Sequence, residues 1–552
     1  MGKLWDVVIV GSGNAALCAG IAACEHGANV LMIEKADCNM AGGNTKYTAG
    51  AMRFAYETSE DLLPLLATPN DPRIARTDFG SYTQKKFTAD LLSFNDGAPL
   101  SDEQEILVSK SYDTMLWLAR HGVNFDPIWS RQSFEKDDQI VFWGGLTLAA
   151  ENEGVGLFEM ELEAYQKLGG SIRYGCEFQS LRTHEAVITG VTLATGEQIA
   201  AKTVILACGG FESNANMRTE LLGEEWSNAK VRGTPHNTGD GLLAAWALGA
   251  ERYGRFSGCH ATPMDYFMKD FGNLNIPHGE RKNYRKISYF LGVMLNENGV
   301  RFVDEGIDFR NYTYAQFGQA VLRQPSQRAW QIFDSKVFDL LYEEYRFYDA
   351  KYEEADSLKE LLQKCQGLNA IEAEASLKEF NANTDPKTAF DPTIKDGKSS
   401  TSAGVSKSNW AQSIDTPPFR AYPVTGGITF TYGGVKISSN ASIMDKAGSP
   451  VSGLFACGEM VGGVFWGGYP GGSGLTSGAV FGKIAGMSAA ELALNSRLIS
   501  QSLQFTKVTI NSQYLQAKPR RCSNRVALSY RLIEPSLPRP LMLEPFCLTP
   551  PP

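Results

Sequence analysis

The chain has 552 residues, of which 43% are hydrophobic and 20% are charged. This length corresponds to about three to four domain-sized units, and the composition excludes a disordered or fibrous chain. The formal net charge of −9 argues against the basic surface that nucleic-acid binding requires, so we expect no nucleic-acid partner.

The first predicted elements form a β-α-β unit. Residues 5–10 are an apolar run bounded by glycine, which predicts a buried parallel strand. Residues 15–25 are rich in small side chains and predict a helix. Residues 28–33 predict the second strand, which ends at Glu34.

The region that follows is predicted to mix helices with short strands. Residues 55–140 are mostly polar, with apolar residues at helical spacing, and predict mainly helix. Residues 151–168 predict a further helix. Short strands are predicted around residue 172, at 187–193 and at 203–206.

A change in composition along the chain predicts one domain that is split in sequence by another. Residues 256–400 hold more charged residues and tyrosines and fewer glycines, and glycine-rich strand–turn patterns return near residue 425. We therefore expect the first domain to comprise residues 1–255 and 401–495, with a helical excursion at about 55–140. Residues 256–400 would form the inserted domain.

Residues 496–552 differ from the rest in composition. This tail has eight lysines or arginines, two acidic residues and no glycine, hence a net charge of +6 (8 − 2), and it ends in three prolines. We expect a disordered tail. A mispredicted end of the gene is the alternative.

The ten cysteines show no C-x-x-C spacing, so a zinc ribbon or a thioredoxin-type site is not expected. A reduced, cytoplasmic compartment is the favoured interpretation, and disulfides are the alternative. No apolar run reaches the roughly 20 residues that span a bilayer, and the N-terminus enters a strand directly. We therefore expect neither an integral membrane protein nor a signal peptide.

Residues 11–16 carry the strongest motif, Gly-Ser-Gly-Asn-Ala-Ala, between a predicted strand and a predicted helix. Gly11 permits the tight turn, Gly13 lets the backbone approach a pyrophosphate, and Ala16 allows close helix–strand packing. Glu34, at the end of the second strand, is placed to accept hydrogen bonds from a ribose. The motif predicts dinucleotide binding, and a glycine-rich turn without a ligand is the alternative.

Further glycine-rich segments follow in a fixed order along the chain, at residues 41–45, 48–50, 204–210, 237–241, 453–459 and 471–475. In this order the chain resembles the fumarate reductase/succinate dehydrogenase flavoprotein family, over about residues 4–490. The resemblance implies an α/β fold, with a Rossmann-like FAD-binding domain and an inserted α+β capping domain. It also implies that FAD is the cofactor.

The resemblance assigns a part of FAD to each segment. Glu34 would hold the adenosine ribose, residues 42–50 would lie along the isoalloxazine, and Asp240 and Glu459 would face the pyrophosphate and ribityl part. The helix opened by Ser473 would point its N-terminus at the flavin N1/O2 edge, where a helix dipole stabilises the charge of reduced flavin. The complete set of expected cofactor-binding residues is Gly11, Gly13, Asn14, Ala15, Ala16, Glu34, Lys35, Gly42, Gly43, Asn44, Thr45, Thr48, Gly50, Asp240, Glu459, Ser473 and Leu475.

Membrane-bound members of the family attach FAD to a histidine in the early glycine-rich loop. This chain has no histidine between His26 and His121. We therefore expect non-covalent FAD.

Two segments of the inserted domain resemble the family's catalytic motifs. Residues 258–263 resemble its H-P-T motif, which implies that His260 binds a substrate carboxylate. Residues 295–305 resemble the signature N-x-x-G-x-R-F-x-x-E, which precedes a proton-transferring arginine. Arg310 occupies the place of that arginine, one residue further on than is typical.

The residues near Arg310 leave a second interpretation open. Asp304 or Asp308 would then hold Arg310 in a salt bridge, and its role would be structural. Arg301 is expected to pair with an acid such as Glu305.

Residues 278–286 are a basic stretch in an otherwise acidic body. A solvated surface is the default interpretation, and attraction of a polyanionic substrate is the alternative. The family's proton relay has an arginine near here, and the sequence does not decide between Arg281 and Arg285.

Two substrate-site segments depart from the fumarate reductases. Residues 428–434 read Ile-Thr-Phe-Thr-Tyr-Gly-Gly, where the family has histidine, and residues 467–472 read Gly-Gly-Tyr-Pro-Gly-Gly, where it has arginine. Together with residues 308–314, Asp-Phe-Arg-Asn-Tyr-Thr-Tyr, these segments are most similar to the tricarballylate dehydrogenase branch, whose members oxidise a saturated tricarboxylate to cis-aconitate. The Tyr-Pro-Gly turn is also similar to 3-ketosteroid dehydrogenases. Tyr469 would therefore bind a carboxylate, bind a ketone or only pack.

We expect an FAD-dependent dehydrogenase that desaturates a C–C bond next to a carboxylate or carbonyl group. Arg310 would be the base, and His260, Thr429 and Tyr469 would bind and polarise a small anionic or carbonyl substrate, with a tricarballylate-like acid favoured. The alternatives are a ketone or steroid desaturase, a fumarate-reductase-like reductase and a non-catalytic flavin-binding module. The sequence does not identify the electron acceptor, for which a separate redox protein is one candidate.

Overall fold

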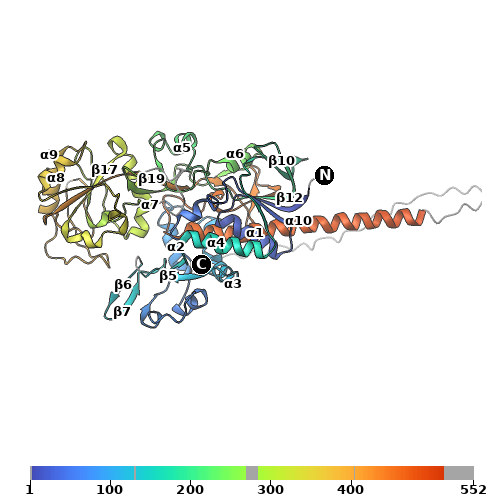
Figure 1. Cartoon of the computed structure of the whole chain (residues 1–552), viewed down its shortest axis with the longest axis horizontal. Helices are drawn as coiled ribbons and strands as arrows, with labels where there is room; N and C mark the ends of the chain where they lie inside the picture. Colours follow the sequence, from blue (N-terminus) through green and yellow to red (C-terminus); the bar gives the residue numbers. More distant parts are fainter. Residues whose placement is uncertain (1–2, 130–131, 269–283, 403, 515–552) are drawn as a thin grey trace, which may run out of the picture. The chain divides into compact units, whose positions relative to one another are not determined.

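The computed structural model describes residues 3–129, 132–268, 284–402 and 404–514, and for 496–514 it describes the backbone only (Figure 1). The chain divides into two compact units, residues 1–497 and residues 498–552. The sheets and the cavity described below all lie in the first unit.

The first sheet has eight strands and is built around the start of the chain, with strand order β10-β11-β12-β1-β2-β9 and with β22 also paired to β12. β1 (Leu4–Val10) pairs in parallel with β2 (Val30–Ile33) and β12 (Gln198–Leu206), and α1 (Asn14–Glu25) connects β1 to β2. This arrangement confirms the predicted β-α-β unit. The other strands are β9 (Ser171–Arg173), β10 (Phe178–His184), β11 (Val187–Leu193), β21 (Ser442–Met444) and β22 (Pro450–Ala456).

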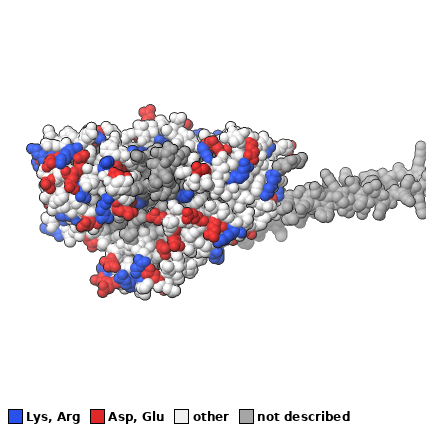
Figure 2. All heavy atoms as spheres, in the orientation of Figure 1, with Lys and Arg blue, Asp and Glu red and all other residues white. Residues whose placement is uncertain are grey.

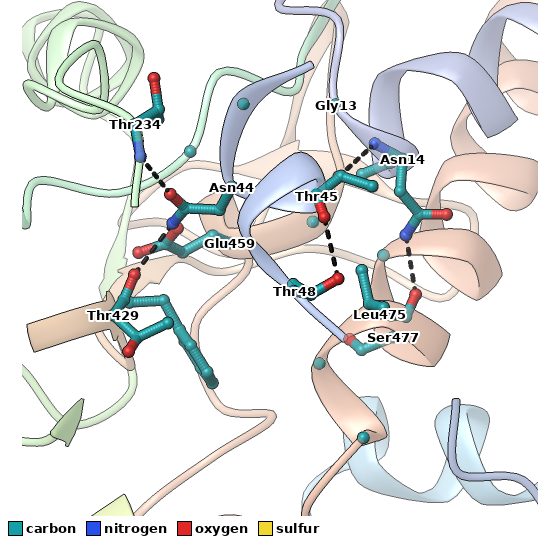
Figure 3. A pocket seen from close by; sticks show the side chains of 18 of the residues that line it. Gly13, Asn14, Asn44, Thr45, Thr48, Thr234, Thr429, Glu459, Leu475 and Ser477 are labelled. Carbon is teal, nitrogen blue, oxygen red and sulfur yellow. Dashed lines mark hydrogen bonds between the residues drawn. The ribbon is translucent and has the colours of Figure 1, made fainter. Parts of the chain in front are cut away.

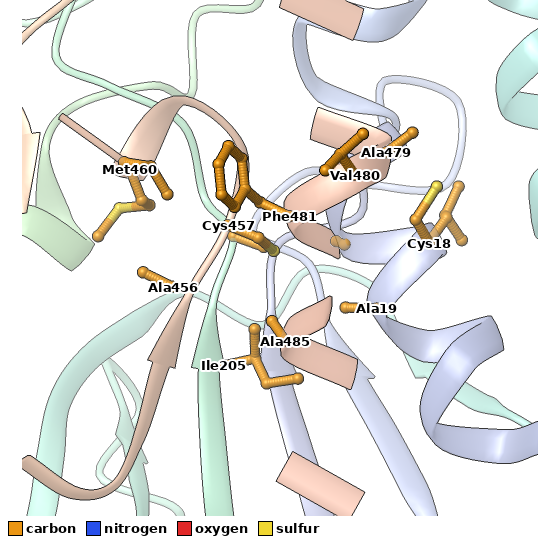
Figure 4. Packing of buried hydrophobic residues seen from close by; sticks show 14 of the residues in the cluster. Cys18, Ala19, Ile205, Ala456, Cys457, Met460, Ala479, Val480, Phe481 and Ala485 are labelled. Atoms are coloured by element: carbon orange, nitrogen blue, oxygen red, sulfur yellow. The ribbon is translucent and has the colours of Figure 1, made fainter. Parts of the chain in front are cut away.

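Two helices from distant parts of the sequence, α1 and α10 (Ser473–Tyr514), pack against each other beside this sheet. α10 packs on α1 through glycines, because a Cβ atom at Gly482 would lie 2.4 Å from the Ala15 carbonyl oxygen and one at Gly486 would lie 2.1 Å from that of Ala19. Figure 4 shows the buried cluster at this contact, with Ala479, Ala485 and Cys18 among its members. This close contact fixes the start of α10 next to the start of α1.

The second sheet is centred on the 13-residue strand β19 (Phe419–Thr431). β19 pairs in parallel with β13 (Lys230–Val231) and antiparallel with β15 (Cys259–Asp265) and β17 (Ala329–Asp334). The remaining strands are β16 (Val293–Asn296), which pairs with β17, and β18 (Glu353–Ala355), which pairs with β19. The sheet thus includes β13, which precedes the expected insertion at 256–400 in the sequence, and β19, which follows it.

One helix covers this sheet where it approaches the first domain. α7 (Arg310–Leu322) lies so close to β15 that a Cβ atom at Gly318 would be 2.5 Å from the backbone of Ala261. α8 (Leu358–Lys364) and α9 (Ala370–Ala382) enclose a separate small core with β16, β17 and β19.

The region predicted to be mainly helical contains α2 (Gln84–Leu92) and α3 (Asp102–Arg120). It also contains β4 (Thr77–Asp78), β5 (Phe125–Pro127), β6 (Ser133–Lys136) and the start of β7 (Gln139–Phe142). β3 (Ala51–Met52) and β8 (Leu148–Ala150) flank the region, and β8 pairs with β3 and β5. These strands are too short for local periodicity to reveal them.

The other elements agree with the predicted order. The helix predicted at 151–168 is α4 (Glu153–Lys167), and the strands predicted near 172, at 187–193 and at 203–206 are β9, β11 and β12. The remaining elements are α5 (Ala215–Leu221), α6 (Asp240–Ala247), β14 (Arg252–Tyr253) and β20 (Gly434–Val435).

The predicted tail begins within α10, which continues to Tyr514, and its part from residue 515 lies outside the described residues. The eight cysteines in the described part of the chain are free thiols. None of the described helices is long and apolar enough to cross a membrane. Figure 2 shows acidic and basic side chains interspersed over the visible face.

Candidate active site

A cavity of about 560 Å³ is lined both by the turns of the first sheet and by β19 and α7 of the second. Most of the expected cofactor-binding residues lie on its wall, which is the first evidence that the dispersed motifs form one site. These are Gly11, Gly13, Asn14, Ala15, Glu34, Lys35, Gly43, Asn44, Thr45, Thr48, Asp240, Glu459 and Leu475.

Four other expected residues are near the cavity but not on its wall. Ala16 is fully buried, and Ser473 donates its hydroxyl hydrogen to the Pro470 carbonyl oxygen at 2.6 Å. Gly42 and Gly50 have φ angles of 112° and 65°, and a Cβ atom at Gly50 would lie 2.6 Å from the backbone of Glu153. These residues therefore shape the backbone behind the cavity wall, and their contact with the cofactor stays a prediction.

Three helices of the first domain begin at the cavity wall. α1 begins at Asn14 directly after Gly13, α6 begins at Asp240, and the first turn of α10 contributes Gly474 and Leu475. The free N–H groups and the dipole at a helix N-terminus favour negatively charged ligand groups. The cavity thus offers several places for phosphate or another anion.

Glu34 supplies a buried carboxylate at the end of β2. Its Oε2 accepts a hydrogen bond from Ser12 Oγ at 2.5 Å, and its Oε1 accepts one from the backbone N–H of Ala36 at 2.8 Å. These bonds hold the carboxylate at the cavity wall, where it is 6% exposed. A carboxylate in this position of a β-α-β unit accepts ribose hydroxyls.

The loop after β2 is held in place by hydrogen bonds of Asn44 and Thr45 (Figure 3). Asn44 donates from Nδ2 to the Thr429 carbonyl oxygen at 2.9 Å, and its Oδ1 accepts from the backbone N–H of Thr234 at 2.9 Å. The backbone N–H of Asn14 donates to Thr45 Oγ1 at 2.9 Å. The loop is therefore held between α1 and β19, as a cradle for a bound group requires.

Two buried carboxyl groups lie behind Asn44. Asn237 Nδ2 donates to Glu212 Oε1 at 2.6 Å and lies 3.4 Å from Glu459 Oε2, while Asn44 Nδ2 also donates to Glu212 at 2.7 Å. Burial raises the pKa of both glutamates, and the neighbouring Glu459 raises that of Glu212 further. Glu459 lines the cavity as a weakly acidic group.

Three arginines line the end of the cavity formed by β19 and α7. Arg285 forms an ion pair with Glu344 at 2.8 Å, and the Arg310 guanidinium lies 4.8 Å from the centre of the Tyr342 ring. Arg232 Nε donates to Thr429 Oγ1 at 3.0 Å. Sequence analysis missed Arg232, because it is a single arginine in a turn without any motif spacing of its own. Arg281 lies outside the described residues.

The alternative structural role for Arg310 is not supported by its acidic neighbours in sequence. Asp304 accepts a hydrogen bond from the Ser408 hydroxyl, and Asp308 pairs with Lys395 at 3.3 Å. Arg301, by contrast, pairs with Glu305, which confirms the predicted partner.

Two tyrosines form a hydroxyl pair at the same end of the cavity. The hydroxyl oxygens of Tyr314, on α7, and Tyr469, in the turn before α10, lie 2.6 Å apart. Burial and the contact with Tyr314 raise the pKa of Tyr469 well above its ordinary value, so this hydroxyl stays protonated. Tyr314 is the last residue of the 308–314 segment, for which the motifs predicted no role at this position.

His260 is not a cavity residue. Its ring is 1% exposed and is enclosed by the rings of Tyr314, Phe430 and Tyr469, at centroid distances of 5.0, 5.2 and 4.9 Å. Neither ring nitrogen has a hydrogen-bond partner among the described residues, and burial lowers its pKa well below the ordinary value. The binding of a substrate carboxylate by His260 stays a prediction, and three aromatic rings enclose the imidazole in this structure.

The cavity fits an extended dinucleotide in two respects. Its polar groups suit the parts of a dinucleotide, and the protein backbone at Gly13 leaves space for the ligand. Helix N-termini suit a pyrophosphate, and the buried Glu34 suits ribose hydroxyls. At Gly13 an added Cβ atom would meet protein atoms only at 3.4 Å or more, so the space before it belongs to the cavity.

A family model described as "FAD binding domain" matches residues 6–475 of the chain. The chain belongs to this family of fumarate reductase-like flavoproteins. A probable fumarate reductase of Shewanella frigidimarina is 27% identical over 503 residues, covering 89% of this chain and 75% of its own length. A vinyl phenol reductase of Lactiplantibacillus plantarum is 25% identical and is covered over 98% of its length, together with 90% of this chain.

Solved structures agree with the fold. A flavocytochrome c3 fumarate reductase in an open conformation has a TM-score of 0.66 at 25% identity, with 89% of this chain and 79% of that chain covered. A 3-ketosteroid Δ1-dehydrogenase of Sterolibacterium denitrificans has a TM-score of 0.68 at 19% identity, with 90% and 100% covered. The flavoprotein binds FAD and is an FAD-dependent oxidoreductase that acts on CH–CH groups.

Proposed function

We propose that this flavoprotein oxidises or reduces a C–C bond next to a carboxylate. The observation that carries the proposal is that Arg232, Arg285 and Arg310 line the same cavity as the FAD-binding turns. A guanidinium binds a carboxylate through two parallel hydrogen bonds, so this end of the cavity suits an acidic substrate.

Arg310 is the residue to which we assign proton transfer. Its guanidinium is on the cavity wall at the first residue of α7, against the Tyr342 ring. In reduction the guanidinium would donate a proton to the carbon next to the carboxylate. In dehydrogenation Arg310 would first release a proton to water, and the neutral guanidine would then accept the proton from that carbon. FAD, when bound, supplies the two-electron chemistry as a hydride acceptor or donor.

Thr429 and Tyr469 would help to bind the substrate. Thr429 already uses its hydroxyl oxygen to accept a hydrogen bond from Arg232 and so holds that guanidinium. Tyr469 has a protonated hydroxyl near the cavity and can donate a hydrogen bond to a carboxylate or carbonyl oxygen.

A tricarballylate-like acid remains our favoured substrate, with dehydrogenation as the favoured direction. Several arginines at one end of the cavity suit a substrate with several carboxylates. The reductive direction is the alternative, and relatives named as fumarate, acrylate and urocanate reductases favour it.

A ketone desaturase is the second candidate, and the pair of Tyr314 and Tyr469 favours it. Two tyrosine hydroxyls 2.6 Å apart make a strong hydrogen-bond donor, which would polarise a ketone oxygen. For either substrate we infer that electrons pass to or from a separate redox partner. We also infer a reduced, cytoplasmic compartment, which the eight described free thiols support.

Anaerobic mixing tests the proposal directly. Oxidised protein is mixed with saturated mono-, di- and tricarboxylic acids and with saturated ketones, and photoreduced protein with the matching unsaturated compounds, while flavin absorbance is followed. Loss of absorbance with a saturated acid, or its return with an unsaturated one, supports carboxylate chemistry. A response to ketones alone would replace it with the second candidate.

A further inference from the structure

Arg232 is held rigidly at the end of a strand. It follows β13, and its backbone N–H donates to the Ile428 carbonyl oxygen of β19 at 2.8 Å. The whole residue is 7% exposed, and the Nε–H bond to Thr429 fixes the direction of the guanidinium. An arginine loses much conformational entropy when it is immobilised, and here most of that loss has occurred before any ligand binds.

The two terminal NH2 groups of Arg232 have no hydrogen-bond or ion-pair partner among the residues that the structure describes. They are also not sealed inside the protein, and Arg232 is part of the cavity wall. A nine-tenths-buried guanidinium thus presents four unused N–H donors to the cavity. Buried charges are normally paired, so this arrangement indicates that Arg232 is suited to bind an anionic ligand.

The charges at this end of the cavity do not balance. Of the three arginines, only Arg285 has a carboxylate partner among the described residues, Glu344. Arg310 lies against the Tyr342 ring instead. Burial, followed by the charge of Arg285, lowers the pKa of Arg232 to about 10. Because Arg285 is paired with Glu344 and Arg310 is assigned proton transfer, Arg232 is the guanidinium left to bind a ligand anion.

Arg232 and Arg310 come from different elements, since Arg232 follows β13 and Arg310 begins α7, and both line the cavity. The carbon that exchanges a proton with Arg310, and the carboxylate next to that carbon, would lie at the start of α7. Arg232 is therefore left for a carboxylate elsewhere on the same ligand.

We propose that Arg232 binds a second carboxylate of the substrate, distinct from the one beside the reacting C–C bond, and thereby selects acids with two or more carboxylates. This inference rests on the proposed function and specifies its substrate class. Thr429 acts as the positioning residue, since its hydroxyl holds the Arg232 guanidinium toward the cavity.

The test compares the affinities of three saturated acids for the photoreduced FAD-loaded protein, which cannot oxidise them, so that binding is measured without turnover. Propionate, succinate and tricarballylate, which carry one, two and three carboxylates, are titrated anaerobically into wild type, Arg232→Gln and Arg232→Lys. Dissociation constants come from calorimetry, and flavin content and melting temperature report on folding. Arg173→Gln is the matched control, because Arg173 pairs with the exposed Glu197 and is not a cavity residue.

We expect Arg232→Gln to raise the dissociation constants of succinate and tricarballylate by about 10- to 100-fold, which is the usual effect of losing hydrogen bonds to a charged group. The dissociation constant of propionate should rise by less than about threefold. Arg232→Lys should show an intermediate loss of affinity, since lysine keeps the positive charge but cannot form the two parallel hydrogen bonds of a guanidinium. The control should bind all three acids like wild type.

Two results would overturn the inference, and they differ from failure of the proposed function. If Arg232→Gln lowers the affinity for all three acids equally, or for none of them, the role of Arg232 is only to stabilise the pairing of β13 with β19. If Arg232→Gln does not fold, equal affinities of Arg232→Lys and wild type for succinate lead to the same conclusion. Wild type that binds none of the acids would instead refute the carboxylate function itself, and the inference with it.

Discussion

The hydroxyl oxygens of Tyr314 and Tyr469 lie 2.6 Å apart at the cavity. Tyr314 belongs to α7, which begins with Arg310, and Tyr469 precedes α10. A single hydrogen bond thus connects the helix that begins with our proposed proton-transfer residue to the turn before α10, whose first residues line the cavity.

Substitution of either tyrosine by phenylalanine should have the same effect, because each removes the same hydrogen bond. We expect Tyr469→Phe and Tyr314→Phe to lower kcat/KM by about tenfold each, in line with the loss of one hydrogen bond of about 1–1.5 kcal/mol. The double variant should lose little more than either single one. Additive losses would show that the two hydroxyls act independently.

FAD should be released completely by acid precipitation. The loop at residues 41–50 contains no histidine, the residue to which membrane-bound members of the family attach the flavin. We expect all yellow colour in the supernatant, measured by the visible absorbance of the flavin. Colour that stays in the pellet would contradict non-covalent binding.

Gly13→Val should abolish FAD binding while the protein still folds. The φ angle at Gly13 is −73°, and an added Cβ atom would be 3.4 Å from the nearest protein atom, so the substitution is aimed at the cofactor. Flavin content and the melting temperature of the apoprotein measure the two effects.

Gly11→Ala provides the contrast. Gly11 has a φ angle of 105°, and an added Cβ atom would lie 2.4 Å from the Ala207 carbonyl oxygen, so this variant should lose stability as well as flavin.

Normal flavin content in Gly13→Val would show that the first β-α-β unit is not the cofactor site.

Glu212 should make the protein less stable as pH rises. Burial, followed by Glu459, raises the pKa of Glu212 in the folded state above its usual value of 4.5. Between these two pKa values the folded state holds a proton that the unfolded state has lost, so stability is greatest below 4.5 and is lost as pH rises through the folded pKa.

Glu212→Gln should remove this pH dependence, because glutamine keeps the shape of the protonated acid. We expect its melting temperature to approach that of wild type in mild acid and to exceed it in mild alkali. Glu163→Gln serves as the control, since Glu163 is an exposed partner of Lys167. A wild-type profile that rises with pH relative to Glu212→Gln would contradict the account.

The first domain could be predicted from local sequence, and the substrate end of the cavity could not. β1, α1 and β2 follow from a buried apolar run, a glycine turn and a second apolar run, all close together in the chain. Arg232 acquires its role through Thr429, 197 residues later, because only the pairing of β13 with β19 brings the two together.

His260 shows a second limit of prediction from the sequence. Its motif predicts a ligand for a carboxylate, and it gives no sign that the rings of Phe430 and Tyr469, from distant parts of the chain, pack against the imidazole. The same aromatic residues stand in the segments that depart from the family pattern. A motif fixes where the backbone passes, whereas the side chains that cover it depend on tertiary packing.

The rate of a single turnover in Arg310→Gln tests the central claim most directly. The variant keeps the size and some hydrogen bonding of arginine but lacks the proton to transfer, and Arg301→Gln, which breaks the pair with Glu305, is the control. With the acid that proves active in anaerobic mixing, the flavin absorbance change in Arg310→Gln should slow by about 10²- to 10⁴-fold at saturating substrate, with unchanged flavin content. A near-normal rate at saturation with a raised KM would contradict proton transfer by Arg310 and make it a carboxylate ligand.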